Sequence, residues 1–191
     1  MHRTGYISPK APKCPAVIFN NSGSMAANGR VEKTMDIIFS LVHGSKTGID
    51  YYVSDSRTGI PDFVSHLTFD RHGAYTQPLI PLIMGDDYMN PLAIAAIIEE
   101  YPAGVHIIDD GDSITRVVTD ALIMLKDMKK PAYMNPITLY VVREHWQKKA
   151  VDSHYEHLMK RCPEESGFNM SMYHAIPNPT EPGDPDRRLG N

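Results

Sequence analysis

The sequence predicts an α/β fold with a doubly wound, mostly parallel sheet that helices cover on both faces. Short apolar runs of strand length alternate with longer segments whose apolar residues recur at helical spacing. Two of these runs, Ala16–Phe19 and Val105–Ile108, are followed by turn-forming residues, which is typical of buried strands. No repeat or linker interrupts residues 16–176, so we expect one domain between a polar N-terminal arm (1–15) and a Pro-rich C-terminal tail (177–191).

The first strand is expected to lead through the loop Asn20–Ser24 into a helix that begins at Arg30 and ends at Gly44. The apolar residues that predict this helix are Val31, Met35, Ile38, Phe39 and Val42. Two strands follow, Ile49–Ser54 and Phe63–Phe69, and the short link between them allows an antiparallel pair.

After an irregular segment, Pro91–Tyr101 is apolar nearly all round and predicts a buried helix. Asn90 is its expected N-cap residue. The strand Val105–Ile108 comes next, and a helix starts near Ile114. The apolar residues of that helix are Val117, Ala121, Leu122, Leu125 and Met128.

The last part of the chain predicts a strand at Ile137–Val142, an amphipathic helix at Trp146–Arg161 and a final edge strand at Phe168–Ile176. His154 and His157 in that helix are spaced as a helical i, i+3 pair, which favours a surface face over a zinc site because no third ligand is nearby.

Composition limits the classes of function. The 191 residues are 42% hydrophobic and 22% charged, with a formal net charge of -4, so we expect neither a nucleic acid nor a membrane as partner. The 2 cysteines do not predict a disulfide scaffold. No signal-type segment is present, and no apolar run approaches the ~20 residues that span a bilayer. We therefore expect a cytoplasmic protein.

Two polar loops follow predicted strands at the edge of the sheet where ligands of such folds bind. They are Asn20–Ser24 and Asp109–Asp112, and both are rich in oxygen-bearing side chains. Hydroxyl, amide and carboxylate oxygens suit a hard divalent cation, so the sequence predicts a site for Mg²⁺, or for Mn²⁺ or Ca²⁺.

Residues 19–25, 89–93 and 107–112 each lie beside a predicted strand or helix, and in this order they resemble motifs of von Willebrand factor A-like domains. Residues 19–25, Phe-Asn-Asn-Ser-Gly-Ser-Met, resemble its Asp-x-Ser-Gly-Ser motif. Residues 89–93, Met-Asn-Pro-Leu-Ala, are similar to its Thr-Pro-Leu segment, and residues 107–112, Ile-Ile-Asp-Asp-Gly-Asp, resemble its later Asp-Gly segment. The resemblance covers about residues 16–176. It implies a six-stranded sheet with one antiparallel edge strand and a metal-ion-dependent adhesion site, where a partner's carboxylate completes the coordination of the ion.

Transferred by position, the resemblance implies Ser22, Ser24 and Asp110 as metal-site residues. Asn20 stands where the family has Asp, and Asn90 stands where it has Thr. Asn20 removes a negative charge beside the proposed cation, and the affinity of a site for a cation falls when it loses charged ligands. Further candidates that could restore a ligand or a charge are Thr76, Asp86, Asp87 and Asp112.

We therefore expect a degenerate adhesion site, in which the metal binds weakly or has been lost and the loops still bind a protein partner through an acidic side chain of that partner. The expected partner contacts are Asn21, Gly23, Met25 and Gly111.

Simpler and competing interpretations remain open. The polar loops can be turns whose oxygens cap backbone N–H groups. The chain can be a structural subunit of a larger assembly that orders its tails, or a small metal-assisted hydrolase that uses Asp110 and Asp112. We expect a binding module rather than an enzyme, since the sequence has no dinucleotide fingerprint, phosphate-binding loop or nucleophile elbow.

Overall fold

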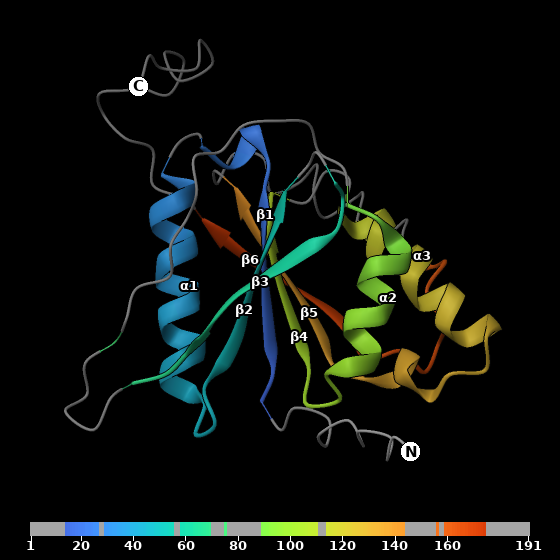
Figure 1. Cartoon of the computed structure of the whole chain (residues 1–191). Coiled ribbons are helices and arrows are strands. Elements are labelled where there is room, and N and C mark those ends of the chain that lie inside the picture. The colour runs from blue at the N-terminus through green and yellow to red at the C-terminus, as the bar shows by residue number, and fades with distance from the viewer. Residues whose placement is uncertain are drawn as a thin grey trace, which may run out of the picture.

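The computed structural model describes residues 14–26, 29–55, 58–69, 75, 89–110, 114–143, 156 and 159–174. Within them lies a six-stranded sheet in the order β3-β2-β1-β4-β5-β6. Figure 1 shows helix α1 on one face of the sheet and helices α2 and α3 on the other. The predicted α/β fold with helices on both faces is thereby confirmed.

The strands begin and end close to their predicted positions. They are β1 (Ala16–Asn21), β2 (Ile49–Asp55), β3 (Pro61–Leu67), β4 (Val105–Asp109), β5 (Ile137–Arg143) and β6 (Phe168–His174). The helices are α1 (Arg30–Gly44), α2 (Pro91–Glu100) and α3 (Ile114–Asp127), with short 3-10 helices η1 (Gly23–Ala26) and η2 (Pro131–Met134).

The order of the strands follows from how each one is connected to the next. β1 and β2, joined through α1, and β4 and β5, joined through α3, pair parallel, because a helical crossover returns the chain to the same edge of the sheet. β2 and β3, joined by the short link 56–60, pair antiparallel, and β3 forms one edge of the sheet. β1 also pairs parallel with β4 at the centre of the sheet, so both strands end at the same edge.

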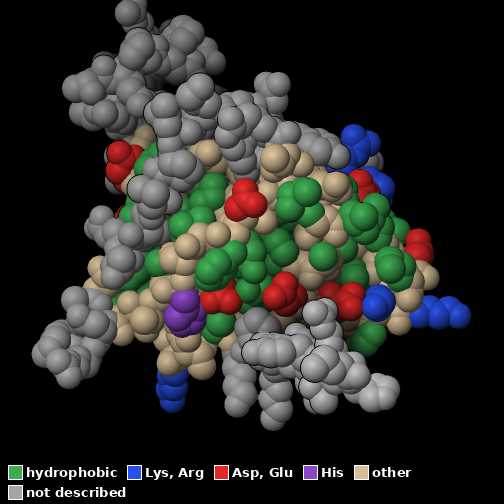
Figure 2. All heavy atoms as spheres, viewed as in Figure 1, with side chains coloured by type: hydrophobic (Ala, Val, Ile, Leu, Met, Phe, Trp, Pro, Cys, Tyr) green, Lys and Arg blue, Asp and Glu red, His purple; other side chains and the backbone are tan. Residues whose placement is uncertain are grey.

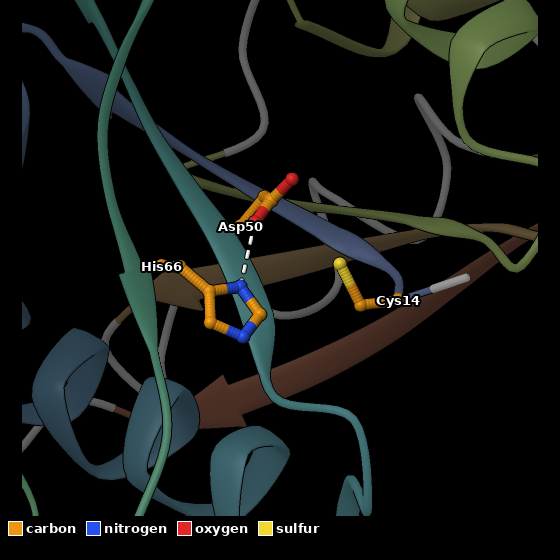
Figure 3. Close-up of side chains that lie close together, drawn as sticks. All are labelled: Cys14, Asp50 and His66. Carbon is orange, nitrogen blue, oxygen red and sulfur yellow. Dashed lines mark hydrogen bonds and ion pairs between the residues drawn. The ribbon is translucent and has the colours of Figure 1, made fainter. Parts of the chain in front are cut away.

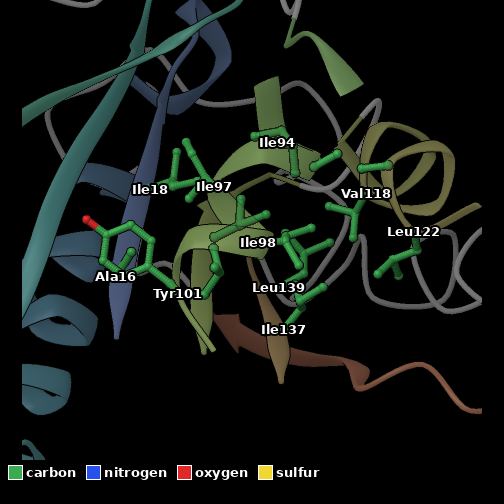
Figure 4. Close-up of a cluster of buried hydrophobic side chains, with 14 of the residues drawn as sticks. Ala16, Ile18, Ile94, Ile97, Ile98, Tyr101, Val118, Leu122, Ile137 and Leu139 are labelled. Atoms are coloured by element: carbon green, nitrogen blue, oxygen red, sulfur yellow. The ribbon is translucent and has the colours of Figure 1, made fainter. Parts of the chain in front are cut away.

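Side chains alternate between the two faces of the sheet and form two buried clusters. One lies beneath α2 and α3 and includes Ile18, Ile98, Ile107, Leu122 and Leu139, some of which are labelled in Figure 4. The other lies beneath α1 and includes Phe19, Met25, Ile38 and Ile108. Burial on both faces explains why the central strands are apolar almost throughout.

Two details of the predicted helices are wrong. The buried face of α1 consists of Arg30, Thr34, Ile37, Ile38 and Val42, so it is rotated from the predicted stripe. Phe39 is 46% exposed and instead meets the rings of Phe69 and Tyr75 at the border of the core. Met128 lies beyond the end of α3 and is 59% exposed, because the helix ends at Asp127.

The N-cap of α2 is confirmed, since the Asn90 side chain accepts a hydrogen bond from the backbone N–H of Leu92 at 2.9 Å. Most of the predicted helix Trp146–Arg161, including His154 and His157, lies outside the described residues, as do most of the arm and the whole C-terminal tail. Among the described helices, none is long and apolar enough to cross a membrane.

Hydrophobic side chains also gather on the surface that Figure 2 shows, where β3 and α2 face the viewer. On these elements the exposed large apolar side chains are Phe63, Val64 and Leu92, and Ile60 is exposed just before β3.

Candidate functional site

The candidate site begins where the central strands end. Asn20 of β1 donates a hydrogen bond from Nδ2 to Oδ1 of Asp109 at the end of β4, at 2.8 Å. Both side chains are almost fully buried, at 2% and 1% exposure. This direct contact, between residues 89 positions apart in the sequence, follows from the parallel pairing of the two strands.

Of the predicted loop Asn20–Ser24, the first two residues belong to the end of β1, and the Ser-Gly-Ser segment forms the turn that follows. β1 continues through Asn21, and η1 forms from Gly23. The Ser22 and Ser24 hydroxyls lie 3.0 Å apart, and Ser22 is fully buried while Ser24 is partly exposed. The two serines that the family resemblance implies as ligands are therefore neighbours in space.

A buried arginine occupies the same region. Arg30, the first residue of α1, donates from Nη1 to the Ser24 carbonyl oxygen at 2.8 Å and contacts Oδ2 of Asp110 at 3.3 Å. The Arg30 and Asp110 side chains are only 8% and 1% exposed. Arg30 thus links η1 to the residue that follows β4. Its positive charge lies beside Asp110, the carboxylate that is expected to support a metal ion.

Several buried oxygens at this edge have no hydrogen-bond partner among the described residues. They are Oδ1 of Asn20, Oδ1 of Asn21 and Oγ of Ser54. Ser54 of β2 lies opposite Asn20 in the register of β1 and β2. Leaving such an atom without a partner costs about 1–3 kcal/mol, so each one favours a cation, a water molecule or a donor group beside it.

The remaining predicted residues divide into three groups. Asn90 contacts Leu92 and the carbonyl oxygen of Gly59, and no described contact joins it to the serines or to Asp110. Met25 is fully buried, so a partner contact through its side chain is not supported. Thr76, Asp86, Asp87, Gly111 and Asp112 lie outside the described residues.

Sequence reasoning missed Arg30, although the chain contains a signal for it. Counting back from the buried residues Ile37 and Ile38 by seven and eight positions leads to Arg30, which places it on the buried face of α1. A charged residue on an apolar face needs a buried partner, and Asp110 is that partner.

The oxygen atoms of the described groups are of the kind that bind a hard cation, and no described contact joins a serine hydroxyl of the site to a base. The serine hydroxyls contact one another rather than an imidazole, and the carboxylates contact an amide and a guanidinium. The charged side chains among these groups are those of Arg30, Asp109 and Asp110, so one guanidinium lies among two carboxylates. A divalent cation here would compete with the Arg30 guanidinium for Asp110.

Comparison with known proteins gives no match to this chain, whether to a family model or to a curated protein.

Proposed function

We propose that this chain is a protein-interaction module of the von Willebrand factor A-like kind, and that it binds its partner at the edge where β1 and β4 end. The observation that carries the proposal is the buried polar group at this edge, in which Asn20, Ser22 and Asp110 are held by hydrogen bonds and an ion pair. Oδ1 of Asn20 and Oδ1 of Asn21 are buried there without a described partner, and an ion or a water molecule is a usual explanation for such atoms.

The positions of the three resembling segments support the proposal. The Ser-Gly-Ser segment follows the central strand β1, the Asn-Pro segment begins α2, and the Asp-Asp segment ends β4. The sheet also has the antiparallel edge strand that the resemblance implies.

The partner surface in this proposal is small. Gly23 and Ala26 are exposed and Ser24 is partly exposed, whereas Asn21, Ser22 and Met25 are buried. A partner that reaches the buried oxygens must therefore act through a bridging ion or water molecule at Ser24, and a carboxylate on the partner suits a bridging cation.

Divalent metal binding at this edge is expected to be weak. Asn20 carries no charge, and Arg30 already neutralises part of the Asp110 charge. Arg30 also donates a hydrogen bond to the Ser24 carbonyl oxygen, which helps to hold this segment in place.

The test is a titration of the metal-stripped protein with Mn²⁺ and with a short Asp-containing peptide, followed by nuclear magnetic resonance. Mn²⁺ should broaden the signals of residues 22–24 and 110 first, and the peptide should shift them only when Mg²⁺ is present. Ser24→Ala should remove both effects, while Ser40→Ala, on the exposed face of α1, should keep them. Broadening confined to surface carboxylates away from η1 would refute the metal part, and peptide shifts elsewhere would refute the proposed surface.

A subunit of a larger assembly is the second candidate, because hydrophobic side chains gather on the surface in Figure 2 and Phe63, Val64 and Leu92 are exposed on β3 and α2. Light scattering coupled to size-exclusion chromatography tests it: association that Phe63→Ser abolishes would support an assembly contact there, and a monomer at high concentration would argue against self-assembly.

The hydrolase alternative stays a prediction, to be tested by turnover on phosphoesters and its loss in Asp110→Asn.

A further inference from the structure

A second polar group lies at the opposite end of the sheet, where β1 and β2 begin. It consists of Cys14, two residues before β1, Asp50 near the start of β2 and His66 near the end of β3. Asp50 is paired with Ala16 on one side and with His66 on the other. Three neighbouring segments of the sheet therefore each contribute one side chain, and Figure 3 shows these side chains converging.

The distances between their donor atoms are short. One ligand atom from each residue can be chosen so that all three lie within 4.8 Å of one another. His66 Nδ1 and Asp50 Oδ1 are 2.7 Å apart. Bonds of about 2.0–2.3 Å to a tetrahedral Zn²⁺ hold ligand atoms about 3.5 Å apart, so small side-chain movements would bring these three atoms to coordination distance.

From this arrangement we infer that Cys14, Asp50 and His66 form a Zn²⁺ site. A thiolate, an imidazole and a carboxylate are the ligands that zinc takes in proteins, whereas Mg²⁺ and Ca²⁺ avoid sulfur. The thiolate and the carboxylate together balance the charge of the ion. Three protein ligands leave a fourth position for water or another ligand.

The carboxylate is held by a second layer of hydrogen bonds. Tyr101, at the end of α2, donates its hydroxyl proton to Asp50 Oδ2 at 2.7 Å. The Tyr52 hydroxyl lies 2.8 Å from that of Tyr101 and must be the donor to it, since Tyr101 has only one proton to give. Such outer contacts fix the orientation of a metal-binding carboxylate and leave its Oδ1 for the ion.

The backbone makes room for the imidazole. A Cβ atom on Gly48 would lie 2.6 Å from His66 Nε2 and 2.6 Å from the Leu67 carbonyl oxygen, and Gly48 has a φ of 75°. Glycine at this turn therefore permits the ring of His66 to lie where it faces Asp50.

The three side chains differ in exposure, from the buried Cys14 to the partly exposed His66, so an ion can reach the group from solvent. Cys14 is 7% exposed, and the side chains of Asp50 and His66 are 16% and 44% exposed. Water and the ion can reach the site from the His66 side, while the sulfur is shielded. Burial and the Asp50 charge raise the pKa of the Cys14 thiol, and a bound dication would offset both effects.

The test uses the full chain, stripped of metal and kept reduced, titrated with Co²⁺ as a spectroscopic substitute for Zn²⁺. The wild-type protein should bind one Co²⁺ with a sulfur-to-cobalt charge-transfer band, and Zn²⁺ should displace it. Cys14→Ser should abolish the band, and His66→Gln should weaken Co²⁺ binding by about tenfold or more. Cys162→Ser, which changes the other cysteine, should leave the titration unchanged.

The variants distinguish a site at Cys14 from cobalt binding at the second cysteine. A band that survives in Cys14→Ser and disappears in Cys162→Ser would overturn the assignment, as would the absence of any band in the wild-type protein at millimolar Co²⁺. Circular dichroism and thermal unfolding of each metal-free variant show whether it is folded. Because His66 lies on an edge strand and is partly exposed, His66→Gln gives an answer even if Cys14→Ser fails to fold.

Discussion

Arg30 and Asp110 form a buried ion pair, with Nη1 3.3 Å from Oδ2, between the start of α1 and the residue after β4. The same Arg30 nitrogen holds the carbonyl oxygen of Ser24. The protein thus supplies its own cation at the edge of the sheet where the sequence predicts a metal ion.

Replacing Arg30 by Met should lower the free energy of unfolding by about 3–5 kcal/mol, because it leaves a buried carboxylate without its guanidinium. Millimolar Mg²⁺ should restore part of this loss, since a dication can then approach Asp110. Urea unfolding with and without Mg²⁺ measures both effects. The control is Arg161→Met, which removes a partly exposed ion pair with Asp120, and it should cost about 1 kcal/mol or less. An equal Mg²⁺ effect in the wild type and in Arg30→Met would contradict the proposed competition.

Restoring a carboxylate at position 20 should recreate dependence on a cation. In Asn20→Asp, the hydrogen bond to Asp109 is replaced by two neighbouring carboxylates, so the metal-free protein should lose about 1–3 kcal/mol of stability. Its affinity for Mg²⁺ should rise about tenfold or more, since about 1.4 kcal/mol of added attraction suffices. Calorimetric titration checks this, with Asn169→Asp on the exposed face of β6 as the control. Unchanged Mg²⁺ binding in Asn20→Asp would place any cation elsewhere.

His106 should make stability depend on pH. Burial lowers its pKa from 6.5 to about 4, so between these values the unfolded chain binds a proton that the folded chain does not. The free energy of unfolding should therefore increase by up to about 3 kcal/mol from this residue as the pH rises from 4 to 6.5, and the same contribution should be lost as the pH falls. Urea unfolding across this range should show a shallower slope in His106→Gln, which retains a polar group near the Tyr140 hydroxyl. Parallel slopes in the two proteins would argue against the lowered pKa.

Gly48 should tolerate no side chain. Gly48→Ala should cost about 1–3 kcal/mol, because its φ is positive and its Cβ would meet the Leu67 carbonyl. Gly44→Ala is the matched control, since a Cβ there has nothing within 4 Å, and it should be neutral or slightly stabilising. Thermal unfolding measures both variants. The affinity of Gly48→Ala for Co²⁺ should also fall, because the added Cβ displaces the His66 ring. Equal stability of Gly48→Ala and Gly44→Ala would contradict the crowding at Gly48.

Local patterns in the sequence predict most of the fold because they report burial directly. The apolar runs of β1 and β4 are buried on both faces, and the Asn90-Pro91 pair begins α2 through a hydrogen bond made within three residues. Where the pattern was ambiguous, the prediction was wrong: Phe39 extended the apolar stripe of α1, and Met128 lies past the end of its helix.

The sequence by itself determined the order and type of the elements and the two polar segments that end β1 and β4, because these depend on residues close together in the chain. Only the tertiary structure decided which polar groups meet. The Asn20–Asp109 contact spans 89 positions and the Arg30–Asp110 pair spans 80, while Cys14, Asp50 and His66 come from three separate segments with no shared motif. Such contacts are fixed by strand order and register, and neither is a property of any single segment.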